Sequence, residues 1–333
     1  MTREPHEPDV ATGELGFAVT QTSERSSDDE APGPAPSERP AAPLQLRDAA
    51  RYQVVTEHGR GGLGRVMRAH DKELGRDVAI KELLDRGNAS ELRFYREALI
   101  TARLEHPGIV PVHEAGRWAD GTPFYAMKLV AGRPLKDLIE AAHGIPERLA
   151  LVGNVIAVAD AIAYAHDRRV IHRDLKPANV IVGEFGETVV IDWGLAKLLD
   201  DPDDETAAAA RPTDGGELTQ AGSVLGTPAY MAPEQYAGRA DERSDIYALG
   251  GLLHHVLTGA PPHLANSAAR ASMPRSVPRD LAAIVARAMA ADPAQRYATA
   301  QAFADDLRRF QRRVPVRARR YSLAARLALG VAR

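Results

Sequence analysis

The sequence contains no cysteine. This absence excludes disulfide bonds, thiolate metal ligands and a cysteine nucleophile, and it is compatible with a reducing compartment. Aromatic residues make up only 5% of the 333 residues, so any core must consist largely of aliphatic side chains. The chain has no uninterrupted apolar run of about 18 residues, which predicts no transmembrane helix. No apolar segment follows Met1, as a secretory signal would require. We therefore expect a cytoplasmic protein.

An excess of charge of one sign is also missing, because the formal net charge is only -3. This value gives no indication of nucleic-acid binding. The two ends of the chain nevertheless carry opposite net charges. Residues 1–50 contain ten acidic residues and four arginines, whereas residues 307–333 contain nine arginines and no acidic residue. Residues 1–50 are also rich in proline and serine and poor in apolar residues, so we predict a disordered acidic leader.

Residues 311–333 form a basic, arginine-rich tail in which leucines alternate with the arginines. Such a pattern is typical of a basic amphipathic helix that touches a membrane surface or an anionic partner. A solvated and partly frayed C-terminus explains the same pattern equally well.

Between the leader and the tail, the predicted secondary structure changes once, from mainly strands to mainly helices. Residues 51–130 contain short β-type runs separated by turn residues, together with one helical pattern over residues 90–104. Residues 131–310 are mainly helical, with two short strand pairs around a polar loop at 170–190. The sequence therefore predicts an α+β fold with two lobes. One lobe is a small antiparallel sheet with one helix, and the other is larger and mainly helical. The predicted helices of the second lobe span 149–166, 243–257, 281–290 and 300–310.

A glycine-rich stretch, Gly59-Arg-Gly-Gly-Leu-Gly-Arg-Val66, lies between two of the predicted strands. Its glycines allow a tight turn and let backbone N–H groups approach phosphate oxygens. It is not a Walker A loop, because no Gly-Lys-Ser/Thr follows it. It is not a dinucleotide-binding turn either, because a strand rather than a helix comes next. Taken alone, the stretch is also compatible with an ordinary glycine-rich hairpin.

A lysine, Lys81, ends the apolar run Val78-Ala-Ile-Lys81. Burying this charge without a partner would be costly. Glu97, on the helix that follows, can reach back and supply the partner. A solvent-exposed lysine on an edge strand is the alternative interpretation of this strand taken in isolation.

The stretch His172-Arg-Asp-Leu-Lys-Pro-Ala-Asn179 brings an aspartate, a lysine and an asparagine into one polar loop. Asp192 follows at the end of the next strand. The oxygens of Asn179 and Asp192 suit Mg²⁺. Asp174 is then left to accept a proton from a hydroxyl group, and Lys176 to neutralise a phosphoryl group. The pattern predicts phosphoryl transfer achieved by positioning and electrostatics.

These motifs, in this order, resemble those of the bacterial eukaryotic-like (Hanks-type) serine/threonine protein kinases over residues 51–310. The resemblance implies a protein kinase fold with an N-lobe at 51–130, a C-lobe at 131–310 and ATP between them. It also implies Mg²⁺, with Mn²⁺ as an alternative, and serine or threonine hydroxyls of proteins as acceptors. The resemblance assigns nucleotide binding to Gly59, Gly61, Gly64, Val66, Ala79, Lys81, Glu97, the gatekeeper Met127 and the hinge residues Lys128 and Val130. It assigns catalysis to Asp174, Lys176 and Asn179, and metal binding to Asn179 and Asp192.

The same resemblance implies a substrate class and two structural contacts. Lys176 and the stretch Gly226-Thr-Pro-Ala-Tyr-Met-Ala-Pro-Glu234 are similar to serine/threonine rather than tyrosine kinases, with Thr227 shaping the acceptor pocket. Asp245 is expected to anchor the catalytic loop from a buried helix. Arg296 is expected to pair with Glu234.

Regulation follows from Arg173, which precedes the catalytic aspartate as in kinases that are switched by phosphorylation of the activation segment. We predict autophosphorylation of Thr219 or Ser223, in trans within a self-dimer, with Arg173 binding the phosphate. Constitutive activity without this switch is the alternative.

Two departures from the family pattern bear on function. Trp193 stands where phenylalanine is usual, and we expect it to fill the same packing role. The connection between Pro262 and Leu281 is short, which affects protein-substrate docking rather than chemistry. A catalytically weak or inactive pseudokinase scaffold is the rival hypothesis, but such proteins usually lack a catalytic lysine or aspartate. A small-molecule kinase is a third, which the peptide platform at 226–234 disfavours.

Overall fold

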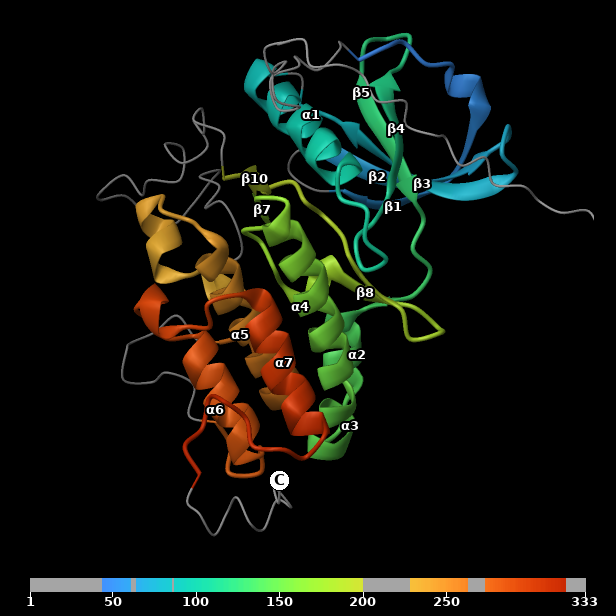
Figure 1. Cartoon of the computed structure of the whole chain (residues 1–333). Coiled ribbons are helices and arrows are strands. Elements are labelled where there is room, and N and C mark those ends of the chain that lie inside the picture. Colours follow the sequence, from blue (N-terminus) through green and yellow to red (C-terminus); the bar gives the residue numbers. More distant parts are fainter. Residues whose placement is uncertain (1–43, 61–63, 86, 200–227, 263–272, 322–333) are drawn as a thin grey trace, which may run out of the picture. The chain divides into compact units, whose positions relative to one another are not determined.

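The computed structural model describes residues 44–60, 64–85, 87–199, 228–262 and 273–321. Two lobes follow one another in this part of the chain. The first is a twisted sheet with one helix and the second is mainly helical (Figure 1). The predicted α+β, two-lobed architecture is therefore confirmed.

The first lobe is built on a five-stranded sheet of order β1-β2-β3-β5-β4, in which every neighbouring pair is antiparallel. Short β-type runs at residues 54–55, 65–68, 77–80 and 124–127 predict four of these strands, whereas the residues of β4 carry no run of β-branched side chains and give no such signal. The strands are β1 (Tyr52–Arg60), β2 (Gly64–Asp71), β3 (Arg76–Leu83), β4 (Val112–Arg117) and β5 (Pro123–Lys128).

Alternation along β3 and β5 separates two apolar clusters on the two faces of the sheet. Val78 and Ile80 on β3 pack on the outer face in a cluster with Phe124 and Ala126. Residues at the intervening positions, including Tyr125, face the other way. This second face receives the helix, so it is the face on which charged side chains of the sheet and the helix can meet.

The α-helix of the first lobe, α1 (Asn88–Ala102), lies within two residues of the predicted range. Phe94 and Ala98 pack on the sheet against Leu83 and Tyr125. Glu97 is buried on the same side of the helix, with 4% of its surface exposed. The sequence of α1 thus places one carboxylate between apolar neighbours.

The free edge of β4 is covered by residues that precede the first strand. Leu46 forms a parallel bridge with Arg117, and backbone hydrogen bonds join Arg47 N–H to the Arg117 carbonyl and Arg117 N–H to the Gln45 carbonyl. We assigned residues 44–50 to the disordered leader, and here the structure differs. The difference arises because an open strand edge supplies backbone hydrogen bonds that composition alone does not predict.

The second lobe consists of helices and short strands that follow β5. The helices are α2 (Leu135–Ala141), α3 (Ile145–Ala150), α4 (Val152–Asp167), α5 (Glu242–Thr258), α6 (Arg279–Ala288) and α7 (Ala300–Gln311). The strands are β6 (Arg133–Pro134), β7 (Val170–Ile171), β8 (Val180–Val182), β9 (Thr188–Val190) and β10 (Lys197–Leu198). They pair as β6-β8-β9 and β10-β7, so the loop between β7 and β8 is held at both ends.

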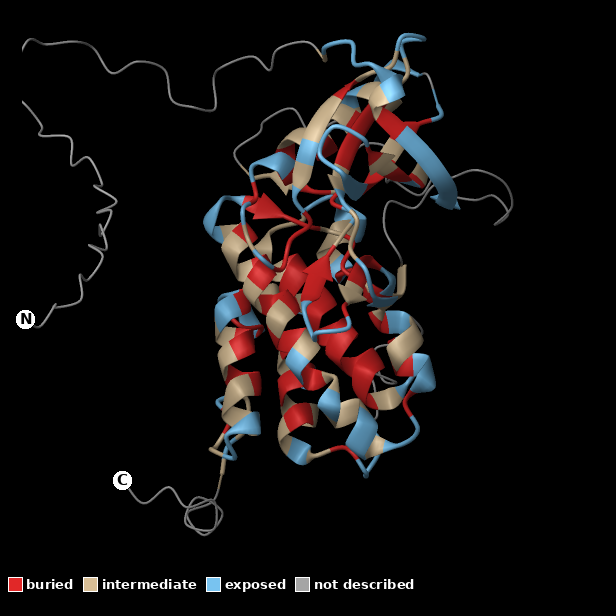
Figure 2. Ribbon diagram, turned by 90° about the vertical axis from the view of Figure 1, so that its right-hand side faces the viewer, coloured by how far each residue is buried: buried red, intermediate tan, exposed pale blue. Residues whose placement is uncertain are grey.

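Helix α5 forms the centre of this lobe, and most of its residues are buried. Figure 2 shows that buried residues gather in the interior of both lobes. Asp241 caps its first turn by accepting from the Arg243 N–H, and Gly259 ends it with a φ of +77°. Helices α4, α6 and α7 pack against it. The stretch Ile145–Asp167, formed by α3 and α4, is long and apolar enough to span a membrane. Its apolar side chains, such as Val155 and Ile162, are instead part of the core.

Residues after α7 are fastened to the second lobe. The carboxylate of Asp306, which is fully buried, accepts hydrogen bonds from the backbone N–H groups of Arg317 and Ala318 and from the Tyr297 hydroxyl. Val316 is part of the core. Residues 311–321, the first part of the tail that the sequence indicated, therefore pack on the second lobe.

Candidate active site

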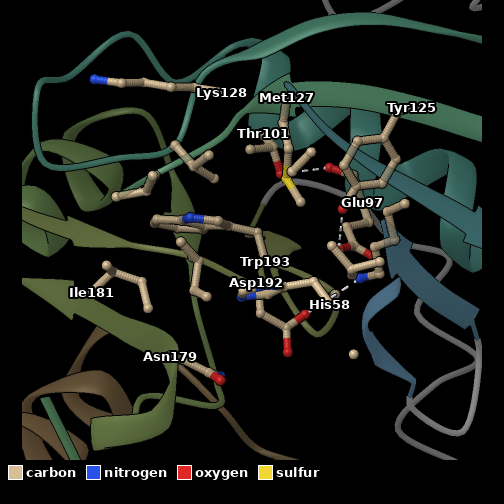
Figure 3. Close-up of a pocket in the computed structure, with 18 of the residues that line it drawn as sticks. His58, Glu97, Thr101, Tyr125, Met127, Lys128, Asn179, Ile181, Asp192 and Trp193 are labelled. Atoms are coloured by element: carbon tan, nitrogen blue, oxygen red, sulfur yellow. Dashed lines mark hydrogen bonds and ion pairs between the residues drawn. The ribbon is translucent and has the colours of Figure 1, made fainter. Parts of the chain in front are cut away.

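A cavity of about 480 Å³ lies between the sheet and the β8–β9 region of the second lobe (Figure 3). Both lobes contribute to its wall, so the residues that the sequence singled out in separate motifs meet here. The predicted site residues that line it are Gly59, Gly64, Val66, Ala79, Lys81, Glu97, Met127, Lys128, Val130, Asn179 and Asp192. Gly61 lies outside the described residues, as do Thr219, Ser223 and Thr227.

Strand register explains how the sheet builds one wall of the cavity. Val66 on β2 is paired with Lys81 on β3, and Ala79 on β3 is paired with Met127 on β5. Cross-strand partners share a face of the sheet, so these side chains all point toward the cavity. Gly64 has no room for a side chain, because a Cβ there would lie 2.2 Å from the Glu82 carbonyl oxygen.

Lys81 and Glu97 form an ion pair on this wall, as the sequence predicted. The distance from Lys81 Nζ to Glu97 Oε1 is 2.5 Å, and a second carboxylate oxygen, Asp192 Oδ1, lies 3.5 Å from the same nitrogen. Burial disfavours the charge on Lys81, but the Glu97 carboxylate outweighs burial and raises the pKa of Lys81 well above its usual value. The lysine is therefore a fixed positive charge at the edge of the cavity.

Asp192 reaches the cavity from a strained backbone position. Its φ is +62°, in the left-handed region that non-glycine residues rarely adopt. Burial raises the pKa of Asp192, but the charges of Lys81 and Lys176 outweigh this effect, so the pKa lies below its usual value and the group is ionised. The side chain is 45% exposed, which leaves its oxygens accessible to a ligand.

The next two residues fix the direction of Asp192. Trp193 is 1% exposed, and its ring lies 4.6 Å from that of the buried His172. The indole thus fills the packing role expected for it. A Cβ on Gly194 would lie 3.1 Å from Glu97 Oε2 and 3.2 Å from Asp192 Oδ1, so glycine keeps the space between these two carboxylates open.

The loop between β7 and β8 brings Asp174, Lys176 and Asn179 together. Lys176 Nζ donates to Asp174 Oδ2 at 2.6 Å. The Asn179 amide nitrogen donates to the backbone carbonyl of Asp174 at 3.0 Å and to Oδ2 at 3.3 Å. Because its nitrogen is engaged with Asp174, the amide oxygen of Asn179 is oriented away from that residue. Asp174 and Lys176 do not line the cavity themselves. They lie next to it, because Asp174 is hydrogen-bonded to Asn179, which does line it.

Asp245 holds this loop from α5, as the sequence predicted. Its carboxylate accepts from the backbone N–H groups of His172 (2.8 Å) and Arg173 (2.9 Å), and it contacts His166 Nε2 at 2.8 Å. Asp245 is fully buried. Burial raises its pKa, but His166 and the other donors outweigh this effect, so the pKa of Asp245 is lowered. A buried, ionised carboxylate therefore fixes the residue that precedes Asp174.

The predicted pair of Arg296 and Glu234 is also present. Two nitrogens of the guanidinium donate to the two carboxylate oxygens at 2.6 and 2.8 Å. This pair joins the start of a short 3-10 helix, Pro233–Ala237, to the segment that follows α6.

Sequence reasoning missed several residues of the site. Gln235 donates through Nε2 to the carbonyl of Arg173 at 3.1 Å, and Tyr125 donates to Glu97. Both are spatial partners whose positions in sequence carry no motif. The register of β3 and β5 is the feature that could have identified Tyr125, because it is paired directly with Lys81. The missed lining residues include Thr101, Val110, Tyr125, Leu129, Ile181 and Ile191.

Comparison with known proteins places these observations in a family. The family described as "Protein kinase domain" matches residues 52–307. The serine/threonine-protein kinase PknD of Protochlamydia amoebophila is 35% identical over 294 residues, which cover 78% of this chain and 30% of that protein. PknD of Chlamydia trachomatis serovar D is 38% identical over 286 residues, which cover 75% of this chain and 30% of that protein. The chain thus spans about a third of the length of these relatives.

A solved structure gives the same result for the fold. The crystal structure of the PknI kinase domain of M. tuberculosis matches with a TM-score of 0.58 and 29% identity. The match covers 80% of this chain and 97% of that domain. The two-lobed arrangement described above is thus shared with a kinase domain over nearly its whole length.

Proposed function

Because this chain belongs to the protein kinase family, we propose that it is a serine/threonine protein kinase, which transfers the γ-phosphate of ATP to serine or threonine hydroxyls of proteins. One observation carries this proposal. The Lys81–Glu97 pair, the ionised Asp192 and Asn179 line a single cavity. Asp174 and Lys176 lie next to it, because Asp174 is hydrogen-bonded to both Asn179 and Lys176. A pseudokinase scaffold is not supported, because the sequence keeps the lysine, glutamate, asparagine and two aspartates that the chemistry needs.

The chemistry of the cavity wall supports ATP as the ligand. The wall that Val66, Ala79 and Met127 share is apolar and suits an adenine ring, and Lys81, the cross-strand partner of Val66, adds a positive charge beside it. Figure 3 shows the Lys128 side chain extending away from Asp192 and Asn179, so its charge does not enter the phosphate end of the cavity. We propose that the triphosphate lies along the glycine-rich hairpin, with Lys81 bound to its α- and β-phosphates.

A magnesium ion is supported by the donor set. Asn179 and Asp192 line the same end of the cavity and offer one amide and one carboxylate oxygen. Mg²⁺ commonly uses one or two protein oxygens and completes its shell with phosphate oxygens and water. When bound, the ion would neutralise phosphate charge, and Mn²⁺ is an alternative.

Asp174 is the residue to which we assign the proton of the acceptor hydroxyl. Its carboxylate is held in place by Lys176 and Asn179, and its backbone by the Asp245 anchor of the preceding residue. Lys176, next to it, would neutralise the charge of the phosphoryl group in flight. General base catalysis by such a positioned carboxylate contributes typically 10²–10⁴-fold in rate.

Regulation and partners extend the proposal. We assign autophosphorylation to Thr219 or Ser223, in trans within a self-dimer, with Arg173 next to Asp174 as the phosphate-binding residue. We also propose that the protein acts in the cytoplasm, where ATP is supplied, and that the basic residues 311–333 contact a membrane surface or an anionic partner.

The proposal is tested with γ-labelled ATP and a generic basic protein as acceptor, with and without Mg²⁺. We expect label in both the acceptor and the kinase chain, dependent on Mg²⁺, and recovered as phosphoserine and phosphothreonine. A Lys81→Met variant should transfer little label, whereas Lys136→Met, which removes an exposed helix lysine, should behave as wild type. Absence of label in both proteins would contradict the proposal. Phosphosite mapping that finds neither Thr219 nor Ser223 modified in active enzyme would refute the regulatory part.

A further inference from the structure

Tyr125 on β5 lies directly opposite Lys81 on the neighbouring strand β3. The two residues are direct partners across the antiparallel β3–β5 pair, so both side chains lie on the face of the sheet that receives α1. Figure 3 shows the Tyr125 hydroxyl directed at Glu97, on α1. Three elements therefore meet at one carboxylate.

The contacts at this carboxylate are short and buried. The Tyr125 hydroxyl donates to Glu97 Oε1 at 2.7 Å, and Lys81 Nζ donates to the same oxygen at 2.5 Å. Tyr125 and Glu97 are each 4% exposed. Burial and the Glu97 carboxylate raise the pKa of Tyr125 well above its usual value, so its hydroxyl keeps its proton and remains a donor. Its ring also packs on Phe94 of α1, with a centroid distance of 5.2 Å.

We propose that Tyr125 is a positioning residue: its hydroxyl holds the Glu97 carboxylate, and through it Lys81 and α1, in the arrangement that binds the phosphates. No part of the reaction passes through Tyr125 itself. This inference rests on the proposed kinase function, because it concerns the residue that orients the phosphate-binding lysine.

The Tyr125 hydroxyl matters because Lys81 has more than one partner. Lys81 Nζ contacts Glu97 and lies 3.5 Å from Asp192, and a bound phosphate would compete for the same donors. The Tyr125 hydroxyl is bonded to Glu97 and not to the lysine, so its hydrogen bond does not require Lys81 Nζ to stay in place. Glu97 then keeps its place, and its other oxygen stays at the narrow gap beside Gly194. Hydrogen bonds to an ionised group are the stronger class.

The test is Tyr125→Phe in the full chain, which keeps the ring and its packing on Phe94 and removes only the hydroxyl. We expect kcat/KM for ATP and the affinity for MgATP to fall by about 10-fold, the size expected when one hydrogen bond to a charged group is lost. The KM for the protein acceptor should not change. In a Glu97→Gln background, the same substitution should have little further effect, because its partner charge is already gone.

Tyr297→Phe is the matched control. Tyr297 makes an equivalent buried hydrogen bond to a carboxylate, Asp306 Oδ2 at 2.8 Å, in the second lobe. Loss of this hydrogen bond in Tyr297→Phe should lower the melting temperature without changing kcat/KM for ATP. Thermal unfolding of every variant shows that it is folded, and direct titration with MgATP gives a readout that does not require turnover.

The outcomes are separable. Wild-type kinetics and affinity in Tyr125→Phe would overturn the positioning role while leaving the kinase function intact. An equal fall in the Glu97→Gln background would also overturn it, because the hydroxyl would then act on the structure in general. If the wild-type chain transfers no phosphate, the proposed function fails, and the MgATP titration of Tyr125→Phe still decides whether the hydroxyl orders the site.

Discussion

Replacing Glu234 with alanine would leave a buried arginine without its counter-charge. The Arg296 side chain is 0% exposed, and two of its guanidinium nitrogens donate to the Glu234 carboxylate. The remaining donors are bound to backbone carbonyls, among them those of Ala290 and Arg243. The guanidinium cannot reach water without breaking these bonds. Ser244, which donates to Glu234 Oε1 at 2.7 Å, would also lose its acceptor.

The expected size of the effect follows from this burial. Removing one partner of a buried ion pair typically destabilises a protein by about 3–5 kcal/mol, because the other charge stays behind uncompensated. A domain of this size loses about 2–4 °C in melting temperature per kcal/mol. We therefore expect Glu234→Ala to lower the melting temperature by roughly 6–20 °C. A double variant, Glu234→Leu with Arg296→Met, should recover much of the loss, because it removes both charges.

Thermal unfolding at neutral pH measures these effects. The matched control is Glu140→Ala, which breaks an exposed i,i+4 pair with Lys136 at 3.7 Å. Exposed pairs of this kind contribute about 0.3–0.5 kcal/mol, so the control should change the melting temperature very little. If Glu234→Ala were as mild as the control, or if the double variant were less stable than the single one, the reasoning from burial would be refuted.

Two further predictions concern pH and the loop between β7 and β8. The Arg51 guanidinium lowers the pKa of Asp71 to about 2, so the stability gained from this pair is fully present above about pH 4 and is lost as the pH falls through 2. Asp71→Asn should therefore lower the melting temperature more at pH 7 than at pH 3, and an equal loss at both would contradict the assignment. Gln235→Ala removes the donor to the Arg173 carbonyl, whose residue has a strained φ of +67°. It should lower kcat by about five-fold without changing MgATP affinity, whereas Gln295→Ala, at an exposed turn, should change neither.

The sequence predicted the parts of the site that lie within single motifs. Asp174, Lys176 and Asn179 are separated by at most five positions in one loop, so their proximity follows from the chain itself. The Lys81–Glu97 pair spans 16 positions, yet it was predictable because an apolar strand cannot hold an unpaired lysine. The helices α5 and α7 were predictable for a different reason: apolar residues recur at helical spacing over several turns of each.

Other parts depend on contacts that no local pattern encodes. Tyr125 reaches Glu97 only because β3 and β5 pair in one register, and a shift of one residue would turn it to the opposite face. The segment at Leu46 is held by the free edge of β4, where Leu46 pairs with Arg117, 71 residues further along the chain. Asp306 orders the start of the tail by accepting backbone N–H groups of Arg317 and Ala318, a contact that composition and charge do not predict.

The central claim is that Asp174 serves a phosphoryl transfer from ATP, and one measurement tests it most directly. The initial rate of label transfer from γ-labelled ATP to a protein acceptor is compared for the wild type, Asp174→Asn and Asp167→Asn, the last at a side chain that is 83% exposed. The account predicts a fall on the order of 10²–10⁴-fold for Asp174→Asn, with unchanged MgATP affinity, and a wild-type rate for Asp167→Asn. A rate for Asp174→Asn equal to that of the wild type would contradict it.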